Sequence, residues 1–385
     1  METRQTTPLI FAAGAAIGGA LTYLYFFRQA PPSAAAATAV APAPAAPSSG
    51  SVGASSFSGA AASAAPFSSS AGSSSGAHSI SSGGNSLPLD GEGRTLHLGL
   101  RAGDVANRIL SVGDVGRAER IAAALLGASR RTTASSRGFV THTGLYNGVE
   151  VSVVATPMGF ANADFVVREC RAVAARGPMA VLRLGTCGGV VPDALPGTVM
   201  VATASVCVRR NPDAAAAPLA AAAPPPPPLP RGCAEGAPTL AATPALPFDV
   251  SGVVRAHGAL AQLYGARLRS GLAPKRFPVR EGLDASADFF YASQGREGAF
   301  WDDRNAALVP LLADAGVACM QMETFHLYDL ARTSLAPNCV FAAAAAIVLV
   351  NRTAKDAGAV SGEDVSWLEV VGGRAALEAL TEFEM

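Results

Sequence analysis

Four clusters of residues in the sequence combine types and spacings that could do chemistry, and the first two pair glycine with arginine. The first cluster reads Ser111-Val-Gly-Asp-Val-Gly-Arg117, a strand end followed by a glycine turn and the start of a helix. Glycine lets a backbone approach a ligand, and the free amides of a helix start beside an arginine attract an anion. The same turn is also a common connection in α/β proteins, so this cluster alone is weak evidence.

The second cluster, Leu182-Arg-Leu-Gly-Thr-Cys-Gly-Gly189, also follows an apolar run. Arg183, Thr186 and the paired glycines offer a bidentate cation, a hydroxyl and flexible amides, which together can hold phosphate or a similar oxyanion. A loop that merely turns the chain is a poorer interpretation, because Arg183 stands inside an apolar strand and a buried charge needs a partner.

The other two clusters have the composition of a base site and a sugar site. Asp288-Phe-Phe-Tyr-Ala-Ser-Gln294-Gly-Arg296 joins aromatic rings to an amide and a guanidinium, which could stack a flat heterocycle and bind its carbonyl and N–H edge. Gln321-Met322-Glu323 begins a predicted helix, and Glu323 could accept two sugar hydroxyls. The alternative is a first-turn glutamate that complements the helix dipole.

The elements that must position these clusters follow the pattern of an α/β fold. Beyond Arg94, short β-branched runs alternate with longer Ala/Leu segments, as strands alternate with helices around a sheet. We expect strands at 109–112, 149–156, 180–184, 198–208 and 340–350. We expect helices at 117–126, 163–176, 250–264, 322–333 and 364–383, the last opened by Ser361 and Asp364.

Three segments are set apart from this domain, 94–385, by composition. Residues 1–32 form a hydrophobic segment, in which 8–27 carry no charge and match the ~20 apolar residues that cross a bilayer. A membrane anchor, an organellar targeting peptide and an ordinary buried helix are the alternatives there. Residues 33–93 are rich in Ala, Ser, Gly and Pro and predict a disordered tether. Residues 209–246 contain a proline run and predict a surface insertion.

Charge and cysteine usage exclude several classes of function. The formal net charge is zero and the chain has no Lys/Arg run, so nucleic acid is not an expected partner. The six cysteines lack C-x-x-C spacing and the five histidines never form H-E-x-x-H, so neither a metal site nor a disulfide framework is expected. Free thiols in a reducing compartment are the default.

Seven motifs, in order and spacing, resemble those of the nucleoside phosphorylase family that includes uridine phosphorylase. They are His97-Leu-Gly-Leu, Gly113-Asp-x-x-Arg117, Ser136-Arg137-Gly-Phe, Arg183-x-Gly-Thr-x-Gly188, Phe290-Tyr-x-x-Gln-x-Arg296, Met322-Glu323 and Val350-Asn-Arg-Thr353. The resemblance runs from about Arg94 to the C-terminus, interrupted by the proline-rich segment. It implies a single three-layer α/β/α domain with a central mixed, partly barrel-like sheet.

The resemblance also implies a site with three parts. The phosphate cradle would comprise Gly113, Arg117, Arg183 and Thr186, with Arg137 from the neighbouring subunit. The sugar would contact Met322, Glu323 and Thr186, with His97 from the neighbour. The base would contact Phe290, Gln294, Arg296 and Gly188. Arg296, Gln294 and Arg183 would carry the chemistry, in a homodimer or larger homo-oligomer that needs no metal or cofactor and uses inorganic phosphate as co-substrate.

Three departures separate this chain from the family pattern. Gln321 stands where relatives usually have the first acid of Glu-Met-Glu. Gly138 follows Arg137 where many bacterial relatives have a glutamate that serves a monovalent cation, so we expect that cation site to be absent. Val115 replaces a usual proline, and Pro157-Met-Gly159 replaces Gly-x-Gly, which affects local loop geometry.

The expected function is phosphorolysis of uridine to uracil and ribose 1-phosphate, in pyrimidine nucleoside catabolism and salvage, with deoxyuridine and thymidine left open. A purine nucleoside phosphorylase is the first alternative, although its Ser-Asp pair is replaced here by Asn351-Arg352. A hydrolytic nucleosidase and a catalytically silent nucleoside-binding or storage protein are the others. The hydrophobic segment predicts attachment to a membrane, or an organellar location after cleavage.

Overall fold

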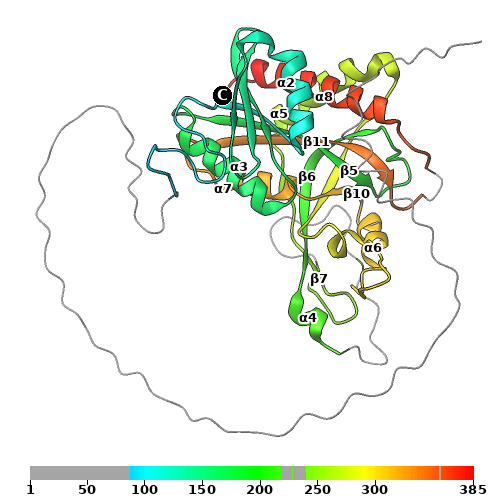
Figure 1. Ribbon diagram of the computed structural model, residues 1–385. Helices are drawn as coiled ribbons and strands as arrows, with labels where there is room; N and C mark the ends of the chain where they lie inside the picture. The colour runs from blue at the N-terminus through cyan, green and yellow to red at the C-terminus, as the bar shows by residue number, and fades with distance from the viewer. Residues whose placement is uncertain (1–86, 219–227, 229–239, 355–356) are drawn as a thin grey trace, which may run out of the picture. The chain divides into compact units, whose positions relative to one another are not determined.

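The structure, a computed structural model, describes residues 87–218, 228, 240–354 and 357–385 (Figure 1). The hydrophobic segment, nearly all of the tether and most of the proline run lie outside the described residues. The predicted localisation, at a membrane through residues 8–27 or in an organelle, is not upheld by the described ranges, in which no helix is long and apolar enough to cross a bilayer. The longest of these helices has 21 residues but carries acids such as Glu363, Asp364 and Glu369.

Within the described residues, eleven strands form one mixed sheet. Nine of them follow the order β10-β9-β6-β11-β5-β1-β4-β3-β2, while β7 and β8 pair with β6. Their bounds are β1 Arg108–Val112, β2 Arg131–Ala134, β3 Val140–Tyr146, β4 Val149–Ala155, β5 Met179–Gly189, β6 Val199–Arg210, β7 Phe248–Val250, β8 Val254–Arg255, β9 Val279–Ala287, β10 Val317–Gln321 and β11 Val340–Asn351.

Part of the sheet closes on itself. β10 runs parallel to β9 and also pairs antiparallel with β5, where Cys319 lies opposite Gly189 and Met320 opposite Gly188. The strands β5, β11, β6, β9 and β10 therefore form a ring of hydrogen-bonded neighbours. The expectation of a mixed α/β sheet is confirmed, and this ring is its barrel-like part.

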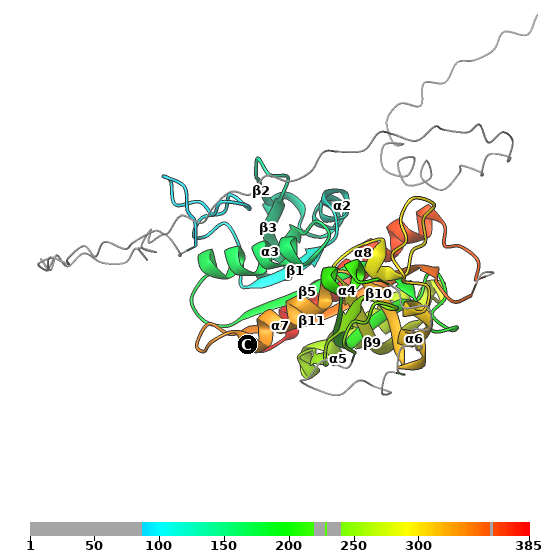
Figure 2. The ribbon, with the colours of Figure 1, turned by 90° about the horizontal axis from the view of Figure 1, so that it is seen from below.

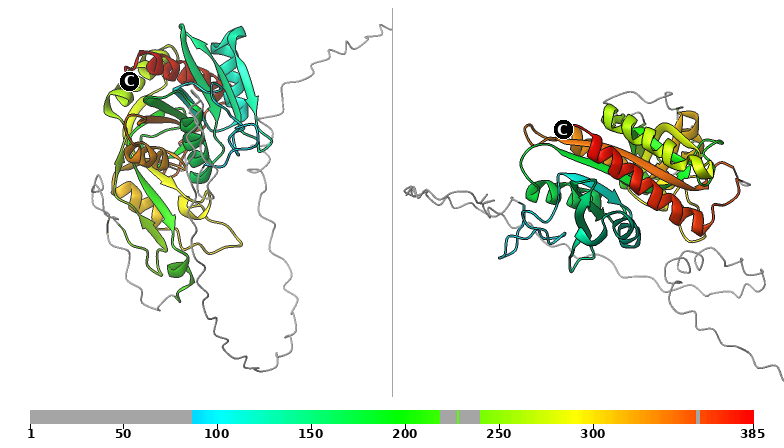
Figure 3. Two further views of the ribbon diagram at one scale, coloured as in Figure 1. Left: turned by 90° about the vertical axis from the view of Figure 1, so that its left-hand side faces the viewer. Right: turned by 90° about the horizontal axis from the view of Figure 1, so that it is seen from above.

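Helices cover both faces of the sheet (Figures 1 and 2). Their bounds are α2 Val115–Leu125, α3 Phe160–Val173, α4 Pro212–Ala216, α5 Gly258–Leu272, α6 Leu308–Asp314, α7 Thr324–Thr333 and α8 Gly362–Glu382. One core joins α2, α5 and α8 to one face, and a second joins α3 and α7 to the other. Figure 3 shows α8 lying beside α5, where the Tyr264 hydroxyl donates to the Gly372 carbonyl at 3.4 Å.

The alternation of side chains along the central strands explains why both faces need cover. In β11, Ala343 and Ala345 belong to the α2/α5/α8 core, whereas Ala342 and Ala344 belong to the α3/α7 core. Successive residues of a strand point to opposite faces, so a strand that is apolar throughout is buried on both. Alanines at these positions leave room for helices to pack closely on each side.

All five predicted strands occur, each with one or both ends shifted from the prediction. The helix predicted at 250–264 begins too early, because Val250 pairs in β7 and the helix starts at Gly258, capped by His257. The predicted insertion, 209–246, begins inside β6 and includes the short helix α4. Near its other end Leu246 is buried, so both ends of the segment pack with the domain. The five cysteines of the described residues are free thiols.

Candidate active site

The first glycine-arginine cluster and the second meet because β1 and β5 are parallel neighbours, with Ser111 opposite Arg183. Parallel strands end at the same edge of a sheet, which is where ligands bind in such folds. Gly113 follows β1 there, and a side chain built on it would lie 3.3 Å from the Arg117 guanidinium and 4.0 Å from that of Arg183. The two arginines are 6% and 4% exposed. Two buried cations therefore face one glycine turn.

Arg117 is fixed by partners on three sides. Its Nε donates to Oε1 of Glu369 at 2.8 Å, one terminal nitrogen donates to the Leu184 carbonyl at 3.1 Å, and the other lies 3.4 Å from the Asp114 carboxylate. Glu369 also pairs with Arg120. Sequence reasoning missed Glu369, although one signal was available: it shares a helical stripe with residues of the buried face, namely Gly372, Gly373, Ala376 and Leu380.

Arg183 pairs with Glu323, as its place in an apolar strand predicted that it must pair with some group. One terminal nitrogen lies 2.5 Å from the Glu323 carboxylate, and the other donates to the Ser111 hydroxyl at 3.3 Å. The second Glu323 oxygen accepts from the backbone N–H of Gly159 at 2.7 Å. Gly159 begins α3 with φ of 97°, a left-handed conformation that favours glycine. The alternative of a simple first-turn glutamate does not hold, since this carboxylate bonds to other elements.

Thr186 and Met322 come from two elements that meet near this site, β5 and the turn after β10. Thr186 is half-buried on β5, opposite Ile347 of β11. Met322 is buried, and its backbone N–H donates to the side chain of Gln321 at 2.8 Å. Because β10 pairs with the end of β5, the turn at Gln321 and Met322 lies beside the glycine-rich end of β5.

The base cluster forms around the turn after β9. The Arg296 guanidinium carbon lies 4.0 Å from the centre of the Phe290 ring, and its Nε donates to the Phe290 carbonyl at 3.1 Å. Gln294 is buried in the short 3-10 turn Ala292–Gln294. Stacking a guanidinium on an aromatic face is favourable and fixes its plane. The predicted aromatic, amide and guanidinium groups are thus neighbours.

Arg352 joins this cluster to β5 and was given no role by sequence reasoning. It donates to the Gln294 backbone carbonyl at 2.8 Å and to the Gln294 side-chain oxygen. Its side chain also lies against Gly188, where any Cβ would overlap the guanidinium. Burial, with a smaller contribution from nearby Arg296, lowers the pKa of Arg352 to about 10. The sequence did indicate that Arg352 has a partner, because this arginine follows an apolar strand in the motif Val350-Asn-Arg-Thr353.

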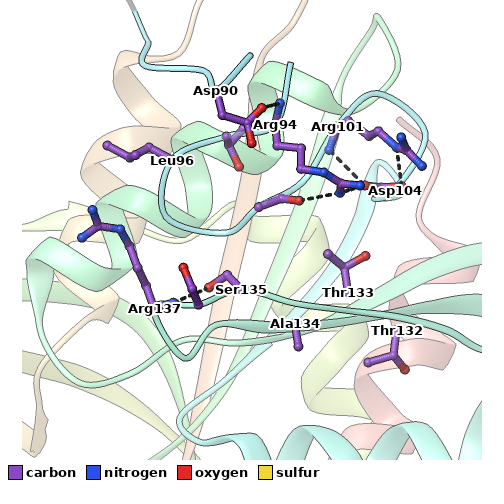
Figure 4. A pocket seen from close by; sticks show the side chains of 13 residues that line it. Asp90, Arg94, Leu96, Arg101, Asp104, Thr132, Thr133, Ala134, Ser135 and Arg137 are labelled. Carbon is purple, nitrogen blue, oxygen red and sulfur yellow. Dashed lines mark hydrogen bonds and ion pairs between the residues drawn. The ribbon is translucent and has the colours of Figure 1, made fainter. Parts of the chain in front are cut away.

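His97 and Arg137 lie in a third region. His97 stacks on Phe165 of α3 with ring centres 3.7 Å apart, and its Nδ1 is 2.6 Å from Glu169. Arg137 is exposed beside a cleft of about 680 Å³ that also includes Arg94 and Arg101. Figure 4 shows Arg137 directed away from Arg101, which lies at the other end of the cleft. Of the predicted site residues, this cleft contains Arg137.

The structure therefore gathers two adjoining clusters from the predicted residues, while His97 and Arg137 lie elsewhere on the chain. Among the described residues, five buried side-chain atoms have no hydrogen-bond partner, and two of them are Nε atoms of Arg183 and Arg352. An unpaired buried donor is costly and marks a place where an acceptor would bind favourably. Both of these donors belong to the clusters described above.

Comparison with known proteins places this chain and its fold in one family. The family model described as the phosphorylase superfamily matches residues 107–383. The chain belongs to the phosphorylase superfamily. It is 28% identical to a uridine phosphorylase of Thermococcus kodakarensis over 274 residues, which cover 70% of this chain and 82% of that relative. It is also 30% identical to a DeoD-type purine nucleoside phosphorylase of Bacillus cereus over 237 residues, 62% of this chain and 80% of the relative.

Solved structures agree with this phosphorylase fold. A structure from work on two diverse uridine phosphorylases of the oomycete Phytophthora capsici has 36% identity and a TM-score of 0.66, covering 78% of this chain and 100% of that one. A Trypanosoma brucei nucleoside phosphorylase, described as showing uridine phosphorylase activity, has a TM-score of 0.61 at 21% identity and supports the fold alone.

Proposed function

We propose that this protein is a nucleoside phosphorylase that cleaves uridine with inorganic phosphate, giving uracil and ribose 1-phosphate. The observation that carries the proposal is the Arg183–Glu323 ion pair at 2.5 Å, which joins a cluster of phosphate type to a carboxylate suited to sugar hydroxyls. The family and its uridine and purine phosphorylase relatives support a pentosyl transfer.

Phosphorolysis breaks the bond between C1′ and the base nitrogen through a transition state with positive charge on the sugar. An anion beside C1′ and donors for the departing base are sufficient, and no covalent nucleophile is required. Phosphate held by Arg117, Arg183 and Thr186 would supply both the attacking oxygen and the countercharge. Inorganic phosphate is then a co-substrate, and we propose that the reaction needs no other cofactor.

The base would leave as an anion that Arg296, Gln294 and Arg352 stabilise. The Gln294 oxygen already accepts from Arg352, so its amide hydrogens point elsewhere and its second lone pair can accept an N–H of uracil. Two guanidiniums near this amide offer donors for a pyrimidine carbonyl. Fixed donors of this kind typically contribute about 10²-fold each to the rate.

We also propose that His97 and Arg137 serve the site of a neighbouring subunit in a homodimer or larger homo-oligomer. Phosphate carries nearly two negative charges at neutral pH, so a third guanidinium from a partner would help to hold it. Phe165 and Glu169 fix the ring of His97, and Arg137 is exposed, as residues offered to a partner would be.

A purine nucleoside phosphorylase is the second candidate, favoured by the similarity to the Bacillus enzyme. The two positions where a purine enzyme has its Ser-Asp pair are arranged differently here. The Asn351 amide donates to the Val191 and Ala194 carbonyls and its oxygen accepts from the Ala354 N–H, so this side chain caps the end of β11. The following Arg352 is a donor that suits a pyrimidine carbonyl.

The test is base release by the full-length chain from uridine, deoxyuridine, thymidine and inosine, with and without phosphate. We expect rapid release of uracil that depends on phosphate and slow turnover of inosine. Equal rates in phosphate-free buffer would show a nucleosidase, and preferential inosine cleavage would show the purine enzyme.

A further inference from the structure

A buried carboxylate lies on one strand of the ring, outside the clusters described above. Asp284 of β9 is 1% exposed. One of its oxygens accepts hydrogen bonds from the Ser205 hydroxyl at 2.6 Å, the Ser286 hydroxyl at 2.8 Å and the Gln321 amide at 2.8 Å. The other oxygen lies 3.6 Å from the Cys319 sulfur. The strand order brings these side chains together, because β9 lies between β6 and β10.

The hydrogen bonds of Gln321 determine which way its amide points. Its oxygen accepts from the backbone N–H groups of Met322 at 2.8 Å, Glu323 at 2.7 Å and Thr324 at 3.3 Å. Its nitrogen faces Asp284 and the Ser286 hydroxyl, at 2.8 and 2.5 Å. The reverse orientation would place amide hydrogens against three N–H groups and the amide oxygen against a carboxylate. The charge of Asp284 therefore selects the observed orientation.

The Gln321 oxygen in turn holds the turn that begins α7. Helix starts leave N–H groups without partners, and Glu323, the cap residue of α7, makes no side-chain bond to its own helix. Gln321 bonds to these groups instead. The turn fixes where the Glu323 carboxylate meets Arg183 and the Gly159 N–H. A chain of contacts thus runs from Asp284 through Gln321 to the carboxylate assigned to the sugar.

We infer that Asp284 is a positioning residue, which acts through Gln321 to place Met322 and Glu323 for the nucleoside sugar. This inference rests on the function proposed above. It also accounts for Gln321, which stands where the family pattern has an acid: here an acid lies one hydrogen bond away on the neighbouring strand. The amide and the carboxylate together do what a single carboxylate would do in contact with the turn.

The surroundings of Asp284 make its charge sensitive to pH. The titratable groups that face it are Cys319 of β10 and Tyr328 of α7. The contact with Cys187 and burial raise the pKa of Cys319, and burial raises the pKa of Tyr328. Burial raises the pKa of Asp284 to about 6, while the hydrogen bonds from Ser205, Gln321 and Ser286 oppose this rise. At neutral pH the carboxylate is ionised and can accept from Gln321.

The test exchanges the two groups. Gln321→Glu alone sets two buried carboxylates side by side, and we expect kcat/KM for uridine to fall about 100-fold at pH 8 and to recover partly at pH 6, where the pair shares a proton. Asp284→Asn alone should raise the KM for uridine about 10-fold and change the KM for phosphate much less. The double variant Asp284→Asn/Gln321→Glu should return to within about 3-fold of the parent, because the new carboxylate contacts the turn and the new amide donates to it.

Hydrogen exchange of the amides at 322–324, measured on the full chain, gives a readout that does not need activity. We expect exchange to be faster in each single variant and to return to the parent rate in the double variant. Asp249→Asn, a half-buried aspartate of β7 that accepts from the Ala242 N–H, is the matched control and should leave this exchange unchanged.

Failure to rescue Gln321→Glu, or unchanged exchange in Asp284→Asn, would overturn the inference. Absence of phosphorolysis in the parent, with the expected exchange pattern intact, would instead refute the proposed function and leave the contact chain standing. Thermal unfolding of each variant shows whether it is folded, and the double variant keeps the test valid if one single variant is not.

Discussion

The contact between Glu369 and Arg117 allows a sharp test of how α8 positions Arg117 in the proposed phosphate site. Glu369 is 3% exposed, and its two oxygens accept from Arg117 at 2.8 Å and from Arg120 at 3.1 Å. Glu369→Gln keeps the shape of the side chain, removes its charge and presents an NH₂ group to one of the two arginines. Arg117 then stays buried without its buried counterion and keeps Asp114, a largely exposed carboxylate 3.4 Å away, as its acidic partner.

The size of the effect follows from burial. Removing one partner of a buried ion pair costs about 3–5 kcal/mol, and the remaining amide oxygen recovers part of this. The Arg120 side chain is 45% exposed, so its share is at most about 1 kcal/mol. We therefore expect the free energy of unfolding to fall by about 2–3 kcal/mol. If the variant loses about 1.4–2.8 kcal/mol of binding free energy for phosphate because Arg117 is less well positioned, the KM for phosphate rises about 10-fold to 100-fold.

Urea unfolding gives the stability, and initial rates at varied phosphate and saturating uridine give the KM. The matched control is Glu382→Gln on the same helix, whose side chain is 40% exposed and pairs with Arg267 at the surface. That variant should lose less than about 1 kcal/mol and keep the parent KM for phosphate. A folded Glu369→Gln protein with an unchanged KM for phosphate would refute the reasoning that α8 positions Arg117.

Three further outcomes follow from the structure. Arg296→Ala should reduce kcat/KM for uridine at least about 10-fold more than any residual inosine activity, since its guanidinium is proposed to bind a pyrimidine carbonyl; equal losses would contradict this. Mixing inactive Arg137→Ala and Glu323→Ala proteins should restore activity well above either parent by subunit exchange if sites are shared, whereas a fully active monomer in sedimentation would rule sharing out. Asp284 binds its proton more tightly in the native state than in the unfolded chain, because burial raises its pKa to about 6. The free energy of unfolding should therefore decline by up to about 3 kcal/mol as pH rises from 4 to 6, and urea unfolding across that range should show a shallower decline in Asp284→Asn.

Local pattern was enough to predict the elements that carry glycine and arginine motifs. Strand β1 is a mainly apolar run followed by Gly113, and β5 is a mainly apolar run that ends in Gly188-Gly189, so the positions of both strands could be predicted. For the hairpin of β3 and β4, the sequence contained a turn signal that could have predicted both strands. Asn147-Gly148 joins the two strands with φ angles of 50° and 79°, a turn that these residues favour, yet β4 alone was predicted.

Contacts between distant segments could not be predicted from pattern alone. Glu369 reaches Arg117 from 252 residues along the chain, and Arg352 reaches Gln294 because β11 and the turn after β9 converge in three dimensions. The residue types made partners necessary, but several acids were available to each arginine. Which acid pairs with which cation depends on the order of strands in the sheet, and that order is set by packing of the whole chain.

The closed strand ring has a consequence for chain entropy. The pairing of Gly189 with Cys319 closes a loop of about 130 residues, and the roughly 20 residues between Pro218 and Leu240 lie inside it. The entropy of loop closure grows only as the logarithm of length, so these residues add about 0.2 kcal/mol to the cost of closing the ring. A change in length there is thus almost neutral for the closure step, which leaves this stretch free to vary while β5 and β10 stay in register.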